Sequence, residues 1–175
     1  MLNIKDCPYA DQIKAAMNAY LPEWAWEWGA AQLYQESAWN AMATNKDSGA
    51  MGIGQFMPET WQEMIDRMGF VDTASAYDPT FAIPAYAYYM RSLRKQWSAP
   101  RPETDRRRLA QASYNAGLGN ILRAQKLSGD AVDSGSILAA LPQVTGATNA
   151  KQTQDYVLKI NQWFLELTGL TGAKG

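Results

Sequence analysis

Apolar residues recur every three or four positions over most of the chain, a spacing that predicts α-helices rather than strands. Pro8 precedes a first such segment, in which Ile13 and Met17 fall on one face. Pro22 is expected to open a second helix that ends within residues 36–39. Two amphipathic helices are therefore predicted near the start of the sequence.

Further helical segments follow, each with a recognisable start or stop signal. Residues 128–147 are rich in Gly, Ser and other small side chains and predict an ordered loop with one helical turn. The expected helices run from Pro58 to Gly69, over 86–97, from Thr104 to Gly117, from there to about Leu127, and from a capping Asn149 onward. Asp78-Pro79 resembles a helix start, but Pro84 leaves the segment before residue 86 open. In the last helix, Tyr156, Ile160 and Leu167 belong to an apolar stripe.

Residues 49–55 contain too many glycines for a helix and predict a turn or a short irregular hairpin. Evidence for strands is otherwise scarce, and neither internal repeats nor a low-complexity linker is present. The pattern therefore predicts a mainly α fold and a single domain over residues 1–175.

The formal charge of −1 on 175 residues provides no basic surface, so no nucleic-acid partner is expected. No apolar stretch approaches the roughly 20 residues of a membrane helix, which predicts no membrane insertion. Asp6 and Pro8 interrupt the first residues before a signal peptide forms, so we expect synthesis in the cytoplasm. Cys7, the single cysteine, is expected to be a small structural residue.

The chain has no histidine, and this absence restricts its chemistry. Ser-His-Asp and Cys-His hydrolysis are excluded, as are zinc sites built on imidazole. We expect no metal and no other cofactor. Acid–base catalysis must then come from carboxylates, Tyr or Lys.

Glu36 is the carboxylate whose surroundings suggest chemistry. Trp24, Trp28, Tyr34 and Trp39 are close to it in the sequence, and an aromatic environment favours a partly desolvated carboxyl group. Desolvation raises the pKa of a carboxyl group and keeps a general acid protonated. The competing interpretation is an ordinary solvated glutamate on a helix surface.

Gly49, Gly52 and Gly54 lead to Gln55 and indicate backbone that approaches another group closely or takes positive φ. A phosphate-binding loop would need a lysine after the last glycine, and none is there. An ordinary surface turn remains an alternative. Similarly, Tyr114-Asn115-Ala116-Gly117 fits either a simple helix end or a Tyr–Asn pair that points into a cleft.

These motifs taken together resemble the soluble lytic transglycosylase family, which is related to goose-type lysozymes. The resemblance rests on Glu36-Ser37, the run from Gly49 to Pro58, Tyr114 to Gly117, and Tyr156-Val157, in the order of the family. It covers about residues 22–168. It implies a lysozyme-like helical catalytic domain with the glycine-rich turn or hairpin beside the active-site cleft.

The resemblance also implies roles for individual residues. Glu36 is the single catalytic acid and then the base, and Ser37 supports the end of its helix. The implied substrate contacts are Gln55 and Met57 around the scissile bond, Tyr114 and Asn115 at the reaction centre, Tyr156 on the cleft wall, and Asn45, which falls near a serine of the family.

Two positions depart from the family pattern. Gly-Leu-Met-Gln of the family is Gly52-Ile53-Gly54-Gln55 here, so the packing methionine is missing. The Glu-Thr that opens the last motif is Gln152-Thr153, which puts any role of that carboxylate in doubt.

The implied activity is cleavage of the β-1,4 bond between N-acetylmuramic acid and N-acetylglucosamine in peptidoglycan, with formation of 1,6-anhydro ends. The first alternative is hydrolysis, as in goose-type lysozymes, with Asp47 as a second carboxylate that positions water. The second alternative is an inactive glycan-binding or structural module of a phage particle.

The expected setting is a bacteriophage endolysin or a virion-associated lysin. The expected partner is the glycan strand of peptidoglycan, with a monomeric enzyme released through a holin or carried in a virion. It would then act in the periplasm or cell wall. The sequence leaves the host and the dependence on peptide stems open.

Overall fold

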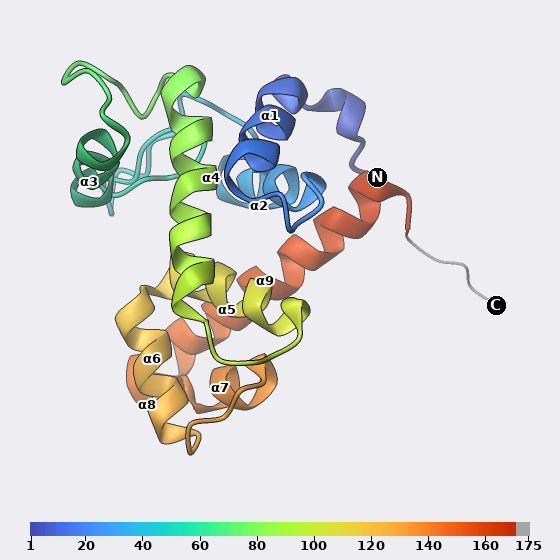
Figure 1. The fold of residues 1–175 in the computed structure, drawn as a ribbon, viewed down its shortest axis with the longest axis vertical. Coiled ribbons are helices and arrows are strands. Elements are labelled where there is room, and N and C mark those ends of the chain that lie inside the picture. The colour runs from blue at the N-terminus through green and yellow to red at the C-terminus, as the bar shows by residue number, and fades with distance from the viewer. Residues whose placement is uncertain (171–175) are drawn as a thin grey trace. The chain divides into compact units, whose positions relative to one another are not determined.

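The computed structural model describes residues 1–170, and the regular structure of these residues is helical (Figure 1). This confirms the predicted mainly α fold class. Within the described part of the chain, no helix has both the length and the apolarity needed to cross a membrane. The elements are η1 (Ile4–Asp6), α1 (Ala10–Tyr20), α2 (Glu27–Ser37), α3 (Pro58–Met68), α4 (Pro79–Gln96), α5 (Glu103–Ala116), α6 (Leu118–Leu127), α7 (Ser134–Ala140), α8 (Pro142–Thr145) and α9 (Ala147–Thr168).

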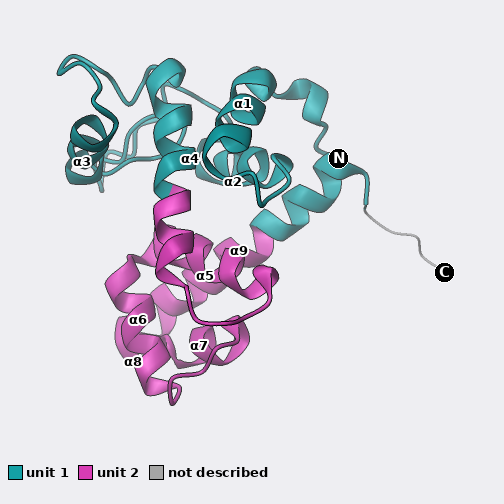
Figure 2. Cartoon of the chain, viewed as in Figure 1, with its two compact units in different colours: residues 1–89, 160–175 teal, residues 90–159 magenta. Residues whose placement is uncertain are grey.

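The chain divides into two compact units (Figure 2). The first unit consists of Met1–Tyr89 and Ile160–Gly175, and the second of Met90–Lys159. Helices α4 and α9 contribute residues to both units. The expectation of a single domain stays a prediction.

Helix α2 is the central element of the first unit. Six consecutive residues, from Trp28 to Leu33, are buried, which is more than one turn, so every face of this helix is covered. Helix α1 packs against it through Met17. A Cβ at Gly29 would lie 2.8 Å from Cγ of Met17, so the close approach of the two helices depends on the missing side chain.

The last turns of α9 also belong to the first unit. The ring of Phe164 stacks on the ring of Trp28, with 3.7 Å between the ring centroids and 3° between the planes. The indole N–H of Trp163 donates to Oε1 of Gln35 over 2.9 Å. These contacts fasten α9 to the middle and end of α2.

The second unit is built from α5, α6, α7 and α8, which pack against one another. Trp97 is buried in this unit, and its indole N–H donates to Oγ of Ser113 over 3.2 Å. The start of α5 is fixed by Glu103, whose carboxylate lies 2.7 Å from nitrogen atoms of both Arg94 and Arg106.

Several predicted helix starts are wrong by a few residues. Helix α2 begins at Glu27 rather than at Pro22, because residues 22–26 form a turn that precedes the helix. Thr104 lies inside α5, which begins at Glu103, so it is not the cap. Asn149 lies within the first turn of α9, and its side-chain amide donates to the carbonyl oxygen of Thr145 over 3.1 Å.

The region predicted as an ordered loop with one helical turn, residues 128–147, contains two helices, α7 and α8. The side chain of Asp133 caps α7 by accepting the backbone N–H of Ser136 over 2.7 Å. Ile137 and Leu141 are buried, so this Gly- and Ser-rich stretch is held as helix by its apolar side. Helix α4 is continuous through Pro84. The sequence had left open whether the residues before 86 are helical.

Candidate active site

Glu36 lies in the last turn of α2, is half-buried, and is followed by an abrupt end of the helix. Ala38 and Trp39 both take left-handed backbone conformations, with φ of 52° and 60°. Such conformations are costly for residues other than glycine and are retained where the surroundings compensate. The compensation here is Trp39, which is buried and donates its indole N–H to the carbonyl oxygen of Ala30 over 2.8 Å.

Ser37 connects the end of α2 to the glycine-rich segment. Its hydroxyl donates to the carbonyl oxygen of Ile53 over 2.8 Å and lies 3.3 Å from the carbonyl oxygen of Leu33. The turn that carries Glu36 is therefore fastened to the segment that the sequence predicts beside it.

The glycine-rich segment is an irregular hairpin with isolated bridges from Met51 to Thr44 and to Phe56, which confirms the predicted turn or hairpin. Gly52 has a φ of +72°, and a Cβ there would lie 1.8 Å from the carbonyl oxygen of Ala76. No residue other than glycine fits this position without a shift of the backbone.

The segment that carries Ala76 is itself held on two sides. The indole N–H of Trp61, in α3, donates to the carbonyl oxygen of Ala74 over 3.1 Å. The hydroxyl groups of Thr44 and Tyr77 lie 3.0 Å apart and form a hydrogen bond. The hairpin thus rests on backbone that cannot easily move away.

Gln55 takes a left-handed conformation with a φ of 50° and bonds to its own hairpin. Its side-chain nitrogen donates to the carbonyl oxygens of Gly52, over 2.9 Å, and Ala43, over 3.2 Å. Both amide hydrogens are used in this way, so a ligand would meet only the oxygen of the amide as an acceptor.

Asn45, Asp47 and Met57 are exposed on the same part of the first unit. The side-chain oxygen of Asn45 accepts the backbone N–H groups of Asp47 and Ser48 over 3.0 and 3.1 Å, so Asn45 shapes the loop that presents Asp47. Met57 immediately precedes α3 and keeps 45% of its surface exposed.

Aromatic side chains gather around the turn of Glu36. The ring of Tyr34 lies edge-on to Trp39 and to Trp163, with centroid distances of 4.8 and 5.1 Å. Tyr34 and Trp163 are half-buried, so part of each ring remains accessible.

Gln32 and Tyr86 form a buried polar pair that was not predicted from the sequence. The hydroxyl of Tyr86 donates to Oε1 of Gln32 over 3.0 Å, and both side chains are buried. Burial raises the pKa of Tyr86 well above its usual value, and the negative charge of Glu36 raises it further. The available signal was Gln32 itself, an amide among small and apolar residues in a buried stretch of helix.

Three predicted residues lie in the second unit. Tyr114 and Asn115 occupy the last turn of α5, which Gly117 ends with a φ of +84°, and Tyr156 is buried in α9. The hydroxyl of Thr153 donates to Oδ1 of Asn115 over 2.8 Å, which fixes the orientation of the amide.

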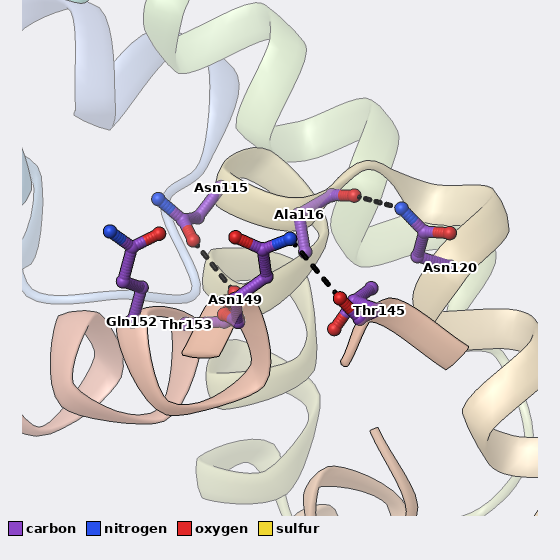
Figure 3. A pocket seen from close by; sticks show the side chains of 7 residues that line it. All are labelled: Asn115, Ala116, Asn120, Thr145, Asn149, Gln152 and Thr153. Atoms are coloured by element: carbon purple, nitrogen blue, oxygen red, sulfur yellow. Dashed lines mark hydrogen bonds between the residues drawn. The ribbon is translucent and has the colours of Figure 1, made fainter. Parts of the chain in front are cut away.

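Asn115 and Thr153 belong to a pocket of about 250 Å³ in the second unit (Figure 3). No charged side chain lines it, so its chemistry is that of amides and hydroxyls, which suits neutral polar groups. Gln152 is part of the lining, at the position where the resembled family has a carboxylate. The lining residues are Asn115, Ala116, Asn120, Thr145, Asn149, Gln152 and Thr153.

The described residues do not bring together three or more Asp, Glu or Cys side chains in a group that would hold a metal ion.

Comparison with known proteins agrees with the resemblance. Residues 15–136 match the family described as Transglycosylase SLT domain. A membrane-bound lytic murein transglycosylase F from Thiobacillus denitrificans is 34% identical over 130 residues, 72% of this chain and 26% of that protein. Its counterpart from Serratia proteamaculans is 29% identical over 170 residues, 89% of this chain and 33% of that protein. The chain thus spans between a quarter and a third of the length of these relatives.

Solved structures share the fold. The 70 kDa soluble lytic transglycosylase from Escherichia coli matches with a TM-score of 0.69 and 21% identity, over 93% of this chain and 25% of that one. The lytic transglycosylase Slt from Pseudomonas aeruginosa, solved as an inactive glutamate-to-glutamine mutant, matches with a TM-score of 0.67 and 23% identity, over 91% of this chain and 24% of that one. The expected fold family is confirmed.

We predict that Gly52→Ala destabilises the first unit strongly. The left-handed backbone alone costs an L-residue about 1–2 kcal/mol, and the methyl group must also displace the carbonyl oxygen of Ala76. Urea unfolding followed by circular dichroism measures the loss. Gly69→Ala is the matched control, because Gly69 has a φ of +63° with nothing within 4 Å of the added Cβ. Equal losses in the two variants would contradict the close-approach argument.

Proposed function

We propose that this chain, which belongs to the Transglycosylase SLT domain family, cleaves the β-1,4 bond between N-acetylmuramic acid and N-acetylglucosamine in peptidoglycan and forms 1,6-anhydro ends. The observation that carries the proposal is the half-buried Glu36 in the last turn of α2, fastened through Ser37 to the glycine-rich hairpin. The murein transglycosylase names of its relatives support the substrate class.

The position of Glu36 supports a proton donor. A carboxyl group in the last turn of a helix lies at the negative end of the helix dipole, where the ionised form is disfavoured. Partial burial acts in the same direction. Glu36 would protonate the glycosidic oxygen as the bond from that oxygen to the anomeric carbon breaks.

The second half of the reaction returns the proton. The 6-hydroxyl of the muramic acid attacks its own anomeric carbon, and its proton passes to the carboxylate of Glu36. One bond to the anomeric carbon breaks, one forms, and the acid is regenerated. An intramolecular nucleophile needs no second carboxylate to activate water, because proximity replaces that activation.

The other residues have supporting roles in this proposal. In the first unit, Ser37 holds the helix end, Gln55 holds the hairpin and offers its amide oxygen, and Met57 offers an exposed apolar contact. In the second unit, Tyr114 and Asn115 are proposed substrate contacts, and the proposed third, Tyr156, is buried. Asn45 shapes the loop of Asp47 through its side-chain oxygen, and its role as a substrate contact stays a prediction.

The pocket of the second unit fits the same substrate class. Its neutral amides and hydroxyls match the hydroxyl and acetamido groups of a glycan, and Gln152 keeps it free of charge. We assign it to binding rather than to chemistry, since none of its lining side chains donates or accepts protons near neutral pH.

Hydrolysis remains the second candidate because Asp47 is presented on an ordered loop. An inactive glycan-binding module is less well supported, since binding alone gains nothing from a half-buried carboxyl group. The bacteriophage setting, with release through a holin or delivery in a virion, stays a prediction, as does the monomeric state.

We predict that Glu36→Gln lowers cleavage of purified peptidoglycan by ~10²–10⁴-fold, because the amide keeps the shape but transfers no proton. Release of soluble fragments measures the rate, and circular dichroism verifies the fold. Glu59→Gln, an exposed glutamate in the first turn of α3, should keep full activity. Near wild-type cleavage by folded Glu36→Gln would remove the basis of the proposal.

Asp47→Asn distinguishes the two reaction types. If the 6-hydroxyl is the nucleophile, this exposed residue is not required, and the rate should fall by less than about tenfold. If water is the nucleophile, the loss should approach that of Glu36→Gln. The same fragment-release assay measures both variants, and a loss as large as that of Glu36→Gln would favour hydrolysis.

Thr153→Val tests the pocket of the second unit. The change removes the hydroxyl that orients Asn115, and a hydrogen bond with a net worth of about 0.5–1.5 kcal/mol corresponds to roughly a two- to tenfold lower kcat/KM. Thr148→Val, at an exposed position near the start of α9, is the matched control. Unchanged kinetics in both variants would argue against a binding role for this pocket.

A further inference from the structure

The buried pair of Gln32 and Tyr86 is unusual for a helical core. The exposed fractions of the two side chains are 0% and 1%, so neither exchanges its hydrogen bond with water. Placing an amide and a hydroxyl in such surroundings gives little or no stability over apolar side chains of the same shape. The pair therefore calls for an explanation other than stability.

The pair lies next to the catalytic acid of the proposed function. Gln32 precedes Glu36 by four residues on α2, so the two side chains share one face of the helix. A helical side chain also covers the turn before its own Cα, which directs the carboxyl group of Glu36 over Gln32. The charge of Glu36 contributes to the raised pKa of Tyr86, which supports the same proximity.

We propose that Gln32 and Tyr86 are positioning residues, which hold the carboxyl group of Glu36 in one orientation through both proton transfers. The hydroxyl of Tyr86 fixes the oxygen end of the Gln32 amide. The amide has one acceptor end and one donor end. With the acceptor end fixed on α4, the donor end is directed to hold a carboxyl oxygen of Glu36.

This inference rests on the proposed role of Glu36 and adds a reason why the polar pair is kept. An acid that becomes a base must present the same oxygen to two atoms in succession, and a misplacement of about 1 Å costs on the order of 10²-fold in rate. Gln32 and Tyr86 restrain the carboxyl group of Glu36 from the preceding turn of α2.

Tyr86→Phe removes only the hydroxyl and is the first test. We expect kcat on uncross-linked glycan strands to fall by about tenfold or more, with KM unchanged within about twofold, because the sugar contacts remain. A merely structural role of Tyr86 would lower thermal stability without this selective effect on kcat.

The double variant Gln32→Leu/Tyr86→Phe guards against a misfolded single variant. Replacing both partners by apolar groups removes the Tyr86–Gln32 hydrogen bond without leaving either of its two atoms unpaired and should preserve the fold. Its kcat should be no lower than that of the worse single variant, since residues that act as one unit lose their effect together. Ser134→Ala is the control, as it removes a buried hydroxyl that bonds Asp105 over 2.6 Å in the second unit.

The outcomes separate the two hypotheses. Wild-type kcat in the folded double variant, together with an inactive Glu36→Gln, would overturn the positioning role and leave the proposed function intact. An equal loss of kcat in Ser134→Ala would also overturn it, because any weakening of the core would then suffice. Full activity of Glu36→Gln would instead overturn the proposed function on which this inference rests.

Discussion

The contact between Gly52 and the carbonyl oxygen of Ala76 is the constraint on which the surroundings of the acid depend. No side chain fits between these two stretches of backbone. Once Gly52 is in place, its carbonyl oxygen accepts from Gln55, and the next carbonyl oxygen, that of Ile53, accepts the hydroxyl of Ser37. A single absent side chain thus fixes the hairpin, and the hairpin fixes the last turn of α2.

Helix α2 combines two opposing demands. Its middle is buried on every side and gives the first unit its rigidity, while its end must hold a carboxyl group and then break off. The helix ends at two residues with left-handed backbone, neither of which is glycine, and the buried indole of Trp39 compensates for their cost. The polar pair beneath Glu36 is a second local departure from an ideal core. Such departures cluster where function competes with stability.

The sequence predicted the fold class, the hairpin and most helix ends, because prolines, glycines and apolar spacing are local signals. Gly69 and Gly117 ended helices as expected. The start of α2 was predicted too early, since residues 22–26 form a turn, and the start of α9 was predicted too late, since the helix already begins at Ala147. Only one helical turn was predicted where the chain forms α7 and α8, because buried Ile137 and Leu141 outweigh the small residues around them.

For the site, the sequence singled out Glu36 and its motifs, but it did not predict what each polar group bonds to. Gln55 uses both amide hydrogens on its own hairpin, and Asn45 shapes a loop. Gln32 and Tyr86 are 54 positions apart, and no local pattern relates them. A contact over such a separation depends on how the chain brings α2 and α4 together, which spacing along the chain does not encode.

The chemical form of the products tests the central claim most directly. Peptidoglycan digested by the purified chain should yield muropeptides whose muramic acid ends are 1,6-anhydro, each lighter by one water than a hydrolytic end and unchanged by borohydride. Mass spectrometry before and after reduction distinguishes the two kinds of end. Products dominated by reducible ends would show that water attacks the anomeric carbon, and would contradict the intramolecular mechanism assigned to Glu36.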